Sequence, residues 1–426
     1  MTLAAYWRLI RDNRNFRRLW LAQIVSEIGD WFYILALYSL LLQLTGKAQS
    51  VGLALVLQVL PATLVGPTAG VVNDRIRRQY VMIAADVARM VIVLGMMLVR
   101  SREMVWLIYP LLFFETVMWG FFEPARSAVI PNLVREDQVV IANTASSITW
   151  SVNFAIGSGL GGLFAVWLGR DAVFMLNALS FLCSALLIGG MRFHEPHASN
   201  TAPFRARELV DFSPVAEGVR YLRRDARLLA TVLLKGGIGI MGANWVIFPI
   251  MGERVFRVRF GDLEAARGAV LGMSLLMSAR GLGALAGPLV STRWAGGRGS
   301  RMRHGILVAF FAGAFGYMLL ASAPTLTLAC ASVALAHGGG SVVWVFSTTL
   351  LQRYSDDKFR GRVFAADLGF CMLLMAVSGY LASVAIDSGI SVRAVASSTG
   401  IAMLMPAFAW LWAMRLWQDA QNQPAG

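Results

Sequence analysis

Residues 51–78 read VGLALVLQVLPATLVGPTAGVVNDRIRR, a long apolar run that ends in a charged cluster. No charged side chain occurs from Val51 to Val72. An α-helix rises about 1.5 Å per residue, so about 20 such residues cross a hydrocarbon core of roughly 30 Å. The segment therefore predicts a transmembrane helix followed by a short polar loop.

Similar apolar runs recur along the rest of the chain and bring the number of predicted spans to twelve. They lie near Leu21–Gln43, Val51–Val72, Val81–Val99, Met104–Phe122, Ser147–Leu168, Ala172–Met191, Leu228–Met251, Gly268–Val290, Gly305–Ala323, Thr325–Leu350, Val363–Ile386 and Ala394–Trp417. We expect an all-α integral membrane protein with two pseudo-symmetric six-helix bundles. The predicted divisions are a first bundle over residues 1–192, a linker over 193–227 and a second bundle over 228–426.

The composition excludes several classes of protein. Only 15% of the 426 residues are charged and 57% are hydrophobic, too few charges for the surface of a soluble domain. The net charge of +14 comes from residues placed between apolar runs, which argues against nucleic-acid binding. A nucleotide-binding glycine loop and a nucleophile elbow are both missing from the sequence, so we expect a protein that is not an enzyme and has no cofactor.

The positive charges also predict an orientation. With the N-terminus inside, the predicted cytoplasmic segments hold 26 of the 38 lysines and arginines and the opposite side holds nine. This split satisfies the positive-inside rule. We therefore expect a multi-pass protein of the bacterial inner membrane with both termini in the cytoplasm.

The two halves repeat short motifs at an offset of about 214–220 residues. Asp30-Trp31 in the first run corresponds to Asn244-Trp245 in the seventh, and Gly70 corresponds to Gly287. Parallel repeats of this kind are typical of transporters whose substrate site lies near the middle of the membrane.

The loop after the second run, Gly70-Val-Val-Asn-Asp74-Arg75-Ile-Arg77-Arg78, resembles the Gly-x-x-x-Asp-Arg-x-x-Arg signature of the major facilitator superfamily. In this interpretation Gly70 allows two helices to approach closely, and Asp74 accepts hydrogen bonds at a neighbouring helix N-terminus. Arg75, Arg77 and Arg78 form an ionic latch and contact anionic lipid headgroups. The alternative is simple positive-inside anchoring by the arginines.

Further segments resemble the branch of this superfamily that includes siderophore and macrolide efflux proteins. They are Asn15-Phe16-Arg17, Gly29-Asp30, Asp86-x-x-Arg89, Glu123–Ser127, Ile130-Pro131, Ala142-Asn143 and Arg360–Val363. The resemblance implies a monomeric secondary transporter that exports amphipathic small molecules by alternating access, coupled to protons. A lysophospholipid transporter or flippase, and a non-transporting sensor or assembly partner, are the alternatives.

Acidic residues inside the predicted spans are the first candidates for a substrate or cation site. A charge at the bilayer centre costs at least about 2.5–3.5 kcal/mol, so it is retained where it faces a cavity or a partner. Asp30 is expected near the midplane, with Glu27 three residues earlier on the same helix face. Glu115 is expected to be alone in the fourth span and to carry a proton or make a structural hydrogen bond.

The second half contributes four more candidates to the substrate site. Lys235 and Arg280 are expected to bind an anionic group or to pair with Asp30, Glu27 or Glu115. Asn244 is the repeat partner of Asp30. His337 precedes Gly338-Gly339-Gly340, where a broken helix is expected to expose carbonyl groups, although a buried, hydrogen-bonded imidazole is the simpler interpretation. The tryptophans Trp31, Trp150 and Trp245 are candidates for stacking on a substrate or for helix packing.

Three charged residues are assigned to an inner gate together with Asp74 and Arg75. They are Asp86 and Arg89 in the third span and Asp367 in the eleventh. In the linker, His194-Glu195-Pro196-His197 offers two histidines and one carboxylate. A lasting metal site usually needs more ligands held by rigid elements, so we expect no metal site there.

Overall fold

The computed structural model describes residues 3–195, 213–258, 265–296 and 298–422, and within these ranges the regular structure is helical throughout. Among the described residues, twelve helical segments are long and apolar enough to cross a membrane. Each overlaps one of the twelve predicted runs. The prediction of an all-α membrane protein with twelve spans is therefore confirmed.

The chain forms two compact units, and each is described separately. The first comprises residues 1–46, 57–211 and 258–274, and the second comprises residues 47–56, 212–257 and 275–426. The start of α3 (Ala48–Arg75) belongs to the second unit because the Asp387 carboxylate accepts hydrogen bonds from the backbone N–H groups of Ala48 and Gln49, both at 2.8 Å. The predicted boundaries at residues 192 and 228 stay a prediction.

The first unit contains six spanning segments and a short helix before them. In chain order its helices are α1 (Leu3–Asp12), α2 (Arg14–Thr45), most of α3, α4 (Arg78–Met96), α5 (Ile108–Leu133), α6 (Val139–Leu168) and α7 (Arg170–Gly189), with the beginning of α11 (Ala265–Ala295). Short 3₁₀ turns, η1 (Arg102–Leu107) and η2 (Glu136–Gln138), precede α5 and α6. The helix α1 precedes the first predicted span, which begins near Leu21.

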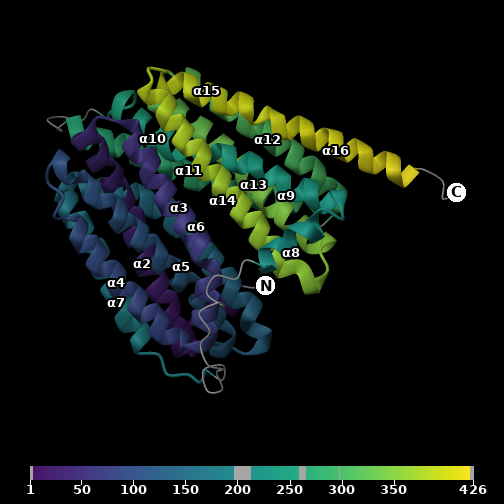
Figure 1. Cartoon of the computed structure of the whole chain (residues 1–426), viewed down its shortest axis with the longest axis horizontal. Helices are drawn as coiled ribbons and strands as arrows, with labels where there is room; N and C mark the ends of the chain where they lie inside the picture. Colours follow the sequence, from purple (N-terminus) through teal and green to yellow (C-terminus); the bar gives the residue numbers. More distant parts are fainter. Residues whose placement is uncertain (1–2, 196–212, 259–264, 297, 423–426) are drawn as a thin grey trace. The chain divides into compact units, whose positions relative to one another are not determined.

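Close packing around α2 depends on glycines. A Cβ added to Gly29 would overlap the side chains of Asn177 and Ser180 on α7, and one added to Gly161 of α6 would lie 2.8 Å from the Phe32 Cα. Small residues of this kind let membrane helices approach closely where there is little hydrophobic driving force between them. Figure 1 shows α2, α4, α5 and α7 side by side in this unit.

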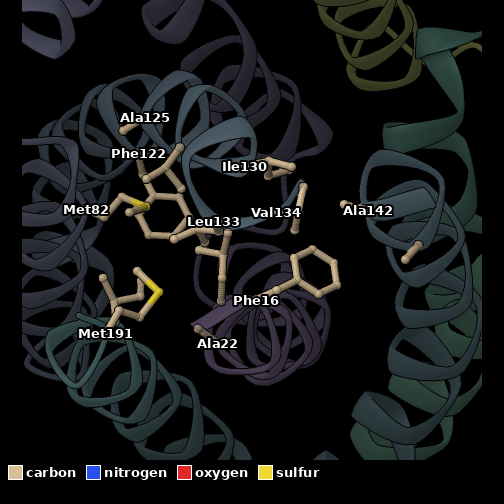
Figure 2. Close-up of a cluster of buried hydrophobic side chains, with 14 of the residues drawn as sticks. Phe16, Ala22, Met82, Phe122, Ala125, Ile130, Leu133, Val134, Ala142 and Met191 are labelled. Atoms are coloured by element: carbon tan, nitrogen blue, oxygen red, sulfur yellow. The ribbon is translucent and has the colours of Figure 1, made fainter. Parts of the chain in front are cut away.

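Apolar side chains hold together the end of the first unit where α2 begins. Phe16 and Met82 are fully buried, and Figure 2 shows them with Leu133, Val134 and other members of one cluster. The labelled side chains come from α2, α4, α5 and α6 and from the residues that follow α5 and α7. The cluster fixes these helices relative to one another, and it adjoins the polar groups described below, which lie on the same helices.

The second unit contains the remaining spans and one helix in the predicted linker. Its helices are α8 (Ser213–Leu222), α9 (Ala226–Ile240), α10 (Asn244–Arg254), most of α11, α12 (Gly299–Ser322), α13 (Leu326–Tyr354), α14 (Asp357–Asp387), α15 (Val392–Ala402) and α16 (Leu404–Asn422). The prediction of a broken helix after His337 is wrong, because α13 continues through Gly338–Gly340. These glycines instead allow close packing, since a Cβ on Gly338 would lie 3.3 Å from the Gly283 carbonyl oxygen.

The predicted seventh helix is interrupted where no proline occurs. A 3₁₀ turn, η5 (Met241–Ala243), separates α9 from α10. The Ser378 hydroxyl donates to the Gly239 carbonyl at 2.6 Å, and the Tyr317 hydroxyl and the Asn244 side chain donate to the Met241 carbonyl. These side chains compensate carbonyl groups that the change in helix geometry leaves without a regular partner.

The predicted last helix is also interrupted, at Met403 between α15 and α16. Pro406 is the third residue of α16 and has no N–H to donate to the carbonyl four residues earlier, that of Ala402. The helix therefore ends and restarts just before the proline. The sequence contained this signal, and our predicted run of Ala394–Trp417 ignored it.

An acidic cavity in the first unit

Three polar side chains on α2 share one face of that helix. Gln23, Glu27 and Asp30 are spaced at i, i+4 and i+7, which places them one above the other. All three line the same cavity. Because α2 is continuous and both side chains line one cavity, Glu27 and Asp30 lie on a common face of the helix.

Arg89 of α4 binds acidic side chains from three helices. Its Nη2 lies 2.8 Å from Asp30 Oδ2 on α2, its Nε lies 3.0 Å from Glu115 Oε1 on α5, and its Nη1 lies 3.9 Å from Asp86 Oδ1 on α4. The Arg89 guanidinium also lies 4.0 Å from the centre of the Phe181 ring. With 3% of its side chain exposed, Arg89 is a buried cation surrounded by carboxyl groups.

This cluster corrects three assignments made from the sequence. Arg89 lines the cavity and pairs with Asp30, so we move Arg89 from the inner gate to the candidate binding site. Asp86 is 0% exposed and lies beside Arg89 without lining the cavity, so we assign it to the support of the Arg89 side chain. Glu115 is not alone, because its partner comes from the neighbouring helix α4.

A second polar network lies in the same cavity. Arg126 forms two hydrogen bonds with Glu123, one of them at 2.9 Å, and donates to Gln23 Oε1 at 3.1 Å. Gln23 Nε2 donates to Glu27 Oε1 at 2.8 Å, and Asn153 Nδ2 of α6 donates to Glu27 Oε2 at 2.8 Å. A continuous chain of hydrogen bonds thus links α5, α2 and α6.

The cavity has a volume of about 300 Å³ and lies entirely within the first unit. Its lining residues are Gln23, Ser26, Glu27, Asp30, Trp31, Tyr33, Ile34, Gln58, Arg89, Glu115, Thr116, Trp119, Phe122, Glu123, Arg126 and Trp150. One wall is aromatic: Trp31 and Trp150 meet edge to face, with ring centres 6.1 Å apart. Of the three candidate tryptophans, these two line the cavity.

The lining of the cavity contains more acidic than basic side chains. It includes four carboxyl groups, on Glu27, Asp30, Glu115 and Glu123, against two guanidinium groups, on Arg89 and Arg126. With all of them ionised, the lining carries an excess of two negative charges. An aromatic wall beside surplus negative charge suits a cation with an apolar body, or protons.

The candidate cations of the second unit lie in different surroundings. Lys235 of α9 forms an ion pair with Asp367 of α14, donates to Thr348 Oγ1 at 3.1 Å and lies 4.3 Å from the centre of the Trp344 ring. The side chains of Lys235 and Asp367 are each 2% exposed. Asp367 is therefore the buried partner of Lys235, and its role in an inner gate stays a prediction.

The other candidates of the second unit are packed side chains. The His337 ring is buried, with Nε2 3.2 Å from the Tyr317 hydroxyl, which fits the simpler interpretation of a satisfied imidazole. The Arg280 guanidinium lies 4.3 Å from the centre of the Trp245 ring. Asn244 is 2% exposed and bonds to the backbone of its own helix turn, so it does not repeat the ion pair of Asp30.

The loop between α3 and α4 is the expected inner gate. Within the described part of the first unit, a Cβ on Gly70 would meet no atom within 4 Å, so the close helix approach expected at this glycine stays a prediction. The Asp74 side chain is 77% exposed and lies 3.8 Å from Arg78, and Arg77 donates to the Tyr80 hydroxyl at 3.2 Å. The gating role of this loop, including Arg75, stays a prediction.

The acceptor at the N-terminus of α4 is Glu195, which sequence reasoning had considered only as a weak metal ligand. Its carboxylate accepts from the backbone N–H groups of Arg78 at 2.8 Å and Gln79 at 3.3 Å. Its side chain is 1% exposed and lies 3.9 Å from Arg77. Pro196 and His197 of the same motif lie outside the described residues.

Replacing Glu195 with alanine is expected to destabilise the protein by about 0.5–2 kcal/mol, the usual loss for a helix N-cap. Glu195→Gln keeps an acceptor oxygen and loses the charge that favours a helix N-terminus, so its effect is smaller. Thermal unfolding in detergent measures the loss of stability in both variants. Glu217→Ala is the control, because its ion pair with Arg362 is exposed and is expected to contribute no more than about 1 kcal/mol. An equal loss from both alanine variants would refute the capping role.

Sequence reasoning missed four side chains of the cavity network. These are Gln23, Glu123, Arg126 and Asn153. The spacing of Gln23 to Glu27 and Asp30 on one helix face was a usable signal for the first. Arg126 follows Glu123 by three residues, which places them on one face of a helix. Nothing local to Asn153 indicated its contact with Glu27.

Comparison with known proteins agrees with the fold. The sequence profile of the Major Facilitator Superfamily matches residues 19–379, and this chain belongs to that superfamily. It is 27% identical over 231 residues to the uncharacterized transporter YfiS of Bacillus subtilis (strain 168), an alignment covering 53% of each protein. It is 26% identical over 283 residues to macrolide efflux protein A of Streptococcus pyogenes, covering 63% of this chain and 66% of the relative. The matched region thus spans little more than half of the first relative and just under two thirds of the second.

Among solved structures, the nucleoside transporter NupG has a similar fold. Its TM-score is 0.73 with 15% sequence identity, and the alignment covers 94% of this chain and 99% of NupG. At this identity the likeness concerns the fold alone. Transporters of this superfamily are not enzymes. The chain is a multi-pass membrane protein of this superfamily, with twelve candidate spans among its described residues.

Proposed function

We propose that this transporter exports amphipathic organic cations, coupled to protons, and that the acidic cavity of the first unit holds the cation. The observation that carries the proposal is the excess of carboxyl over guanidinium groups in a cavity with an aromatic wall. Buried carboxylates attract a cation because they have lost the hydration that water would give them.

The two parts of the cavity have different roles in this proposal. Asp30 is 28% exposed at its side chain and lines the cavity while Arg89 holds its orientation, so it contributes negative charge to the cavity wall. Trp31 and Trp150 supply flat apolar surface and attraction between a cation and the ring face. A ligand with one positive charge and an apolar body would use both.

Export is supported by the relative named for macrolide efflux. We propose further that the protein lies as a monomer in the bacterial inner membrane with both termini in the cytoplasm, on the split of 26 to nine lysines and arginines. Alternating access by two six-helix bundles, with the loop around Asp74 and Arg75 as the inner gate, completes the proposal. The energy source is the proton gradient, because the sequence has no nucleotide-binding loop.

Transport of tetraphenylphosphonium and erythromycin in proteoliposomes tests the proposal. We expect the wild type to move both probes faster when a pH gradient is imposed. Asp30→Asn is expected to insert normally and to bind tetraphenylphosphonium up to about 100-fold more weakly, because a carboxylate and a cation about 6 Å apart attract each other by about 3 kcal/mol at an effective dielectric constant of about 20.

Asp171→Asn is the matched control, since Asp171 is an exposed acid paired with Arg100 at 2.5 Å. It is expected to transport both probes like the wild type. A wild type whose flux ignores the pH gradient would overturn proton coupling. Competition by lysophospholipid, with no effect of Asp30→Asn on either cationic probe, would favour the lysophospholipid alternative over the cation proposal.

A further inference from the structure

The four carboxyl groups of the cavity differ in the kind of partner that they have. Asp30 and Glu115 are paired with Arg89, and Glu123 is paired with Arg126. Glu27 accepts hydrogen bonds from two neutral amides, those of Gln23 and Asn153. Among the ion pairs of the described residues, none includes Glu27, although it lines the same cavity.

The hydrogen-bond partner of each carboxyl group determines how much free energy its protonation costs. A proton on Asp30, Glu115 or Glu123 weakens a charge-assisted hydrogen bond to a guanidinium, which is unfavourable. A proton on Glu27 removes a charge that no cation contacts directly. Glu27 is therefore the carboxyl group that can gain and lose a proton with the least disturbance of the ion pairs around it.

The two oxygens of Glu27 are also unequal. The amide that binds Oε1 is fixed in orientation, because Gln23 Nε2 also donates to the Ser146 carbonyl at 3.0 Å and Gln23 Oε1 accepts from Arg126. The side chain of Asn153 makes no hydrogen bond other than that to Glu27 Oε2 among the described residues. A half-turn of the Asn153 amide would present its oxygen to Oε2, where it can accept a hydrogen bond from a protonated carboxyl group.

Charged groups surround Glu27 on several helices. From α5, Arg126 and Glu123 are connected to it through Gln23, and Glu115 lines the same cavity. On its own helix Asp30 lies nearly one turn away, and α4 contributes Arg89. The helix α6 contributes the neutral side chain of Asn153, which contacts Glu27 directly.

We propose that Glu27 takes up and releases the coupling proton at Oε2, and that rotation of the Asn153 amide accompanies each transfer. The inference rests on the proposed function, because it identifies the residue that links protons to the cation site at Asp30. The proton comes from water and returns to water on the opposite side, and no other bond is made or broken. A cation at Asp30 and a proton at Glu27 then compete for the excess negative charge of one cavity.

Flux of tetraphenylphosphonium in proteoliposomes gives the first test. Glu27→Gln is expected to exchange the probe across the membrane and to lose the acceleration caused by a pH gradient, so that flux is equal with and without the gradient. Glu27→Asp keeps a carboxyl group and is expected to retain part of the acceleration. If the wild type is accelerated and Glu27→Gln is accelerated equally, this inference fails while the proposed function stands. If the wild type shows no acceleration, proton coupling itself fails.

Infrared difference spectroscopy of purified protein gives a second test that needs no ligand. Lowering the pH protonates many carboxyl groups, so the wild type is expected to gain several carboxylic acid C=O bands; one of these bands is expected in the wild type and in Asp171→Asn and is expected to be missing in Glu27→Gln. Asn153→Leu is expected to keep the band and change its frequency, because that frequency depends on the hydrogen bonds of the acid. A band that persists in Glu27→Gln and vanishes in Asp30→Asn would place the proton on the Arg89 cluster and overturn the assignment.

Discussion

Replacing Arg89 with leucine is expected to destabilise the protein by about 3–5 kcal/mol, the typical loss when one partner of a buried ion pair is removed. The substitution leaves Asp30, Asp86 and Glu115 close together without their cation. Arg89→Lys keeps the charge and loses the planar fork that reaches two carboxylates at once, so we expect an intermediate loss.

Thermal unfolding and gel filtration in detergent measure this effect. Arg100→Leu is the matched control, because Arg100 follows the same span and its side chain is 53% exposed beside Asp171. Its loss is expected to stay within about 1 kcal/mol. Adding Asp30→Asn to Arg89→Leu removes one unpaired acid and is expected to recover part of the stability. A loss at Arg89 no greater than that at Arg100 would show that the cluster is not a buried ion-pair network.

The second large effect is expected at Lys235 in the second unit. Lys235→Met leaves Asp367 buried without a partner and is expected to cost about 3–5 kcal/mol. Replacing both residues, in Lys235→Met with Asp367→Leu, removes both charges together. Buried ion pairs replaced by apolar side chains of similar size are often neutral or stabilising, so the double variant is expected to recover most of the loss.

The wild type, the two single variants and the double variant form a double-mutant cycle. Their unfolding free energies give the coupling energy between Lys235 and Asp367. Recovery in the double variant would establish Lys235 and Asp367 as one structural pair. A double variant as unstable as the sum of the single variants would mean that the two side chains act independently. Transport retained in a stable double variant would place this pair outside the mechanism.

Hydropathy predicted the spans because membrane insertion is a local property of about 20 residues. The run from Val51 to Val72 needed no knowledge of its neighbours to be recognised, and α3 covers it. The break before Asn244 has no proline and depends on Ser378 and Tyr317 from other helices, so it could not be read from the run itself. Pro406, by contrast, was a visible signal for the break at Met403.

The candidate site was predicted in part. Asp30, Glu27 and Glu115 were selected because acids inside a span are costly without a partner or a cavity, and all three line the cavity. Their partner Arg89 was placed at a gate because the predicted third span began at Val81. The helix begins at Arg78, so Arg89 lies about 16 Å along it, deep enough to meet Asp30. Contacts between helices depend on packing, which a single sequence does not display.

The dependence on packing between helices also explains why the partners of Glu195 and Asp367 could not be predicted from the sequence. Both were assigned from residue type and position along the chain. Their actual partners, the backbone at the start of α4 and the Lys235 ammonium, lie more than 100 residues away in sequence. Only the three-dimensional structure brings each pair together.

The central claim is that the acidic cavity of the first unit binds the transported cation, and blocking the cavity tests it most directly. In protein with the exposed Cys183 replaced by alanine, Ile34→Cys places a thiol in the cavity lining, and Ser322→Cys places one on the exposed surface of the second unit. Equilibrium binding of radiolabelled tetraphenylphosphonium is measured before and after complete reaction with N-ethylmaleimide, with labelling verified by mass spectrometry. We predict that the label abolishes binding at position 34 and leaves it unchanged at position 322. Undiminished binding to fully labelled Ile34→Cys protein would contradict the account.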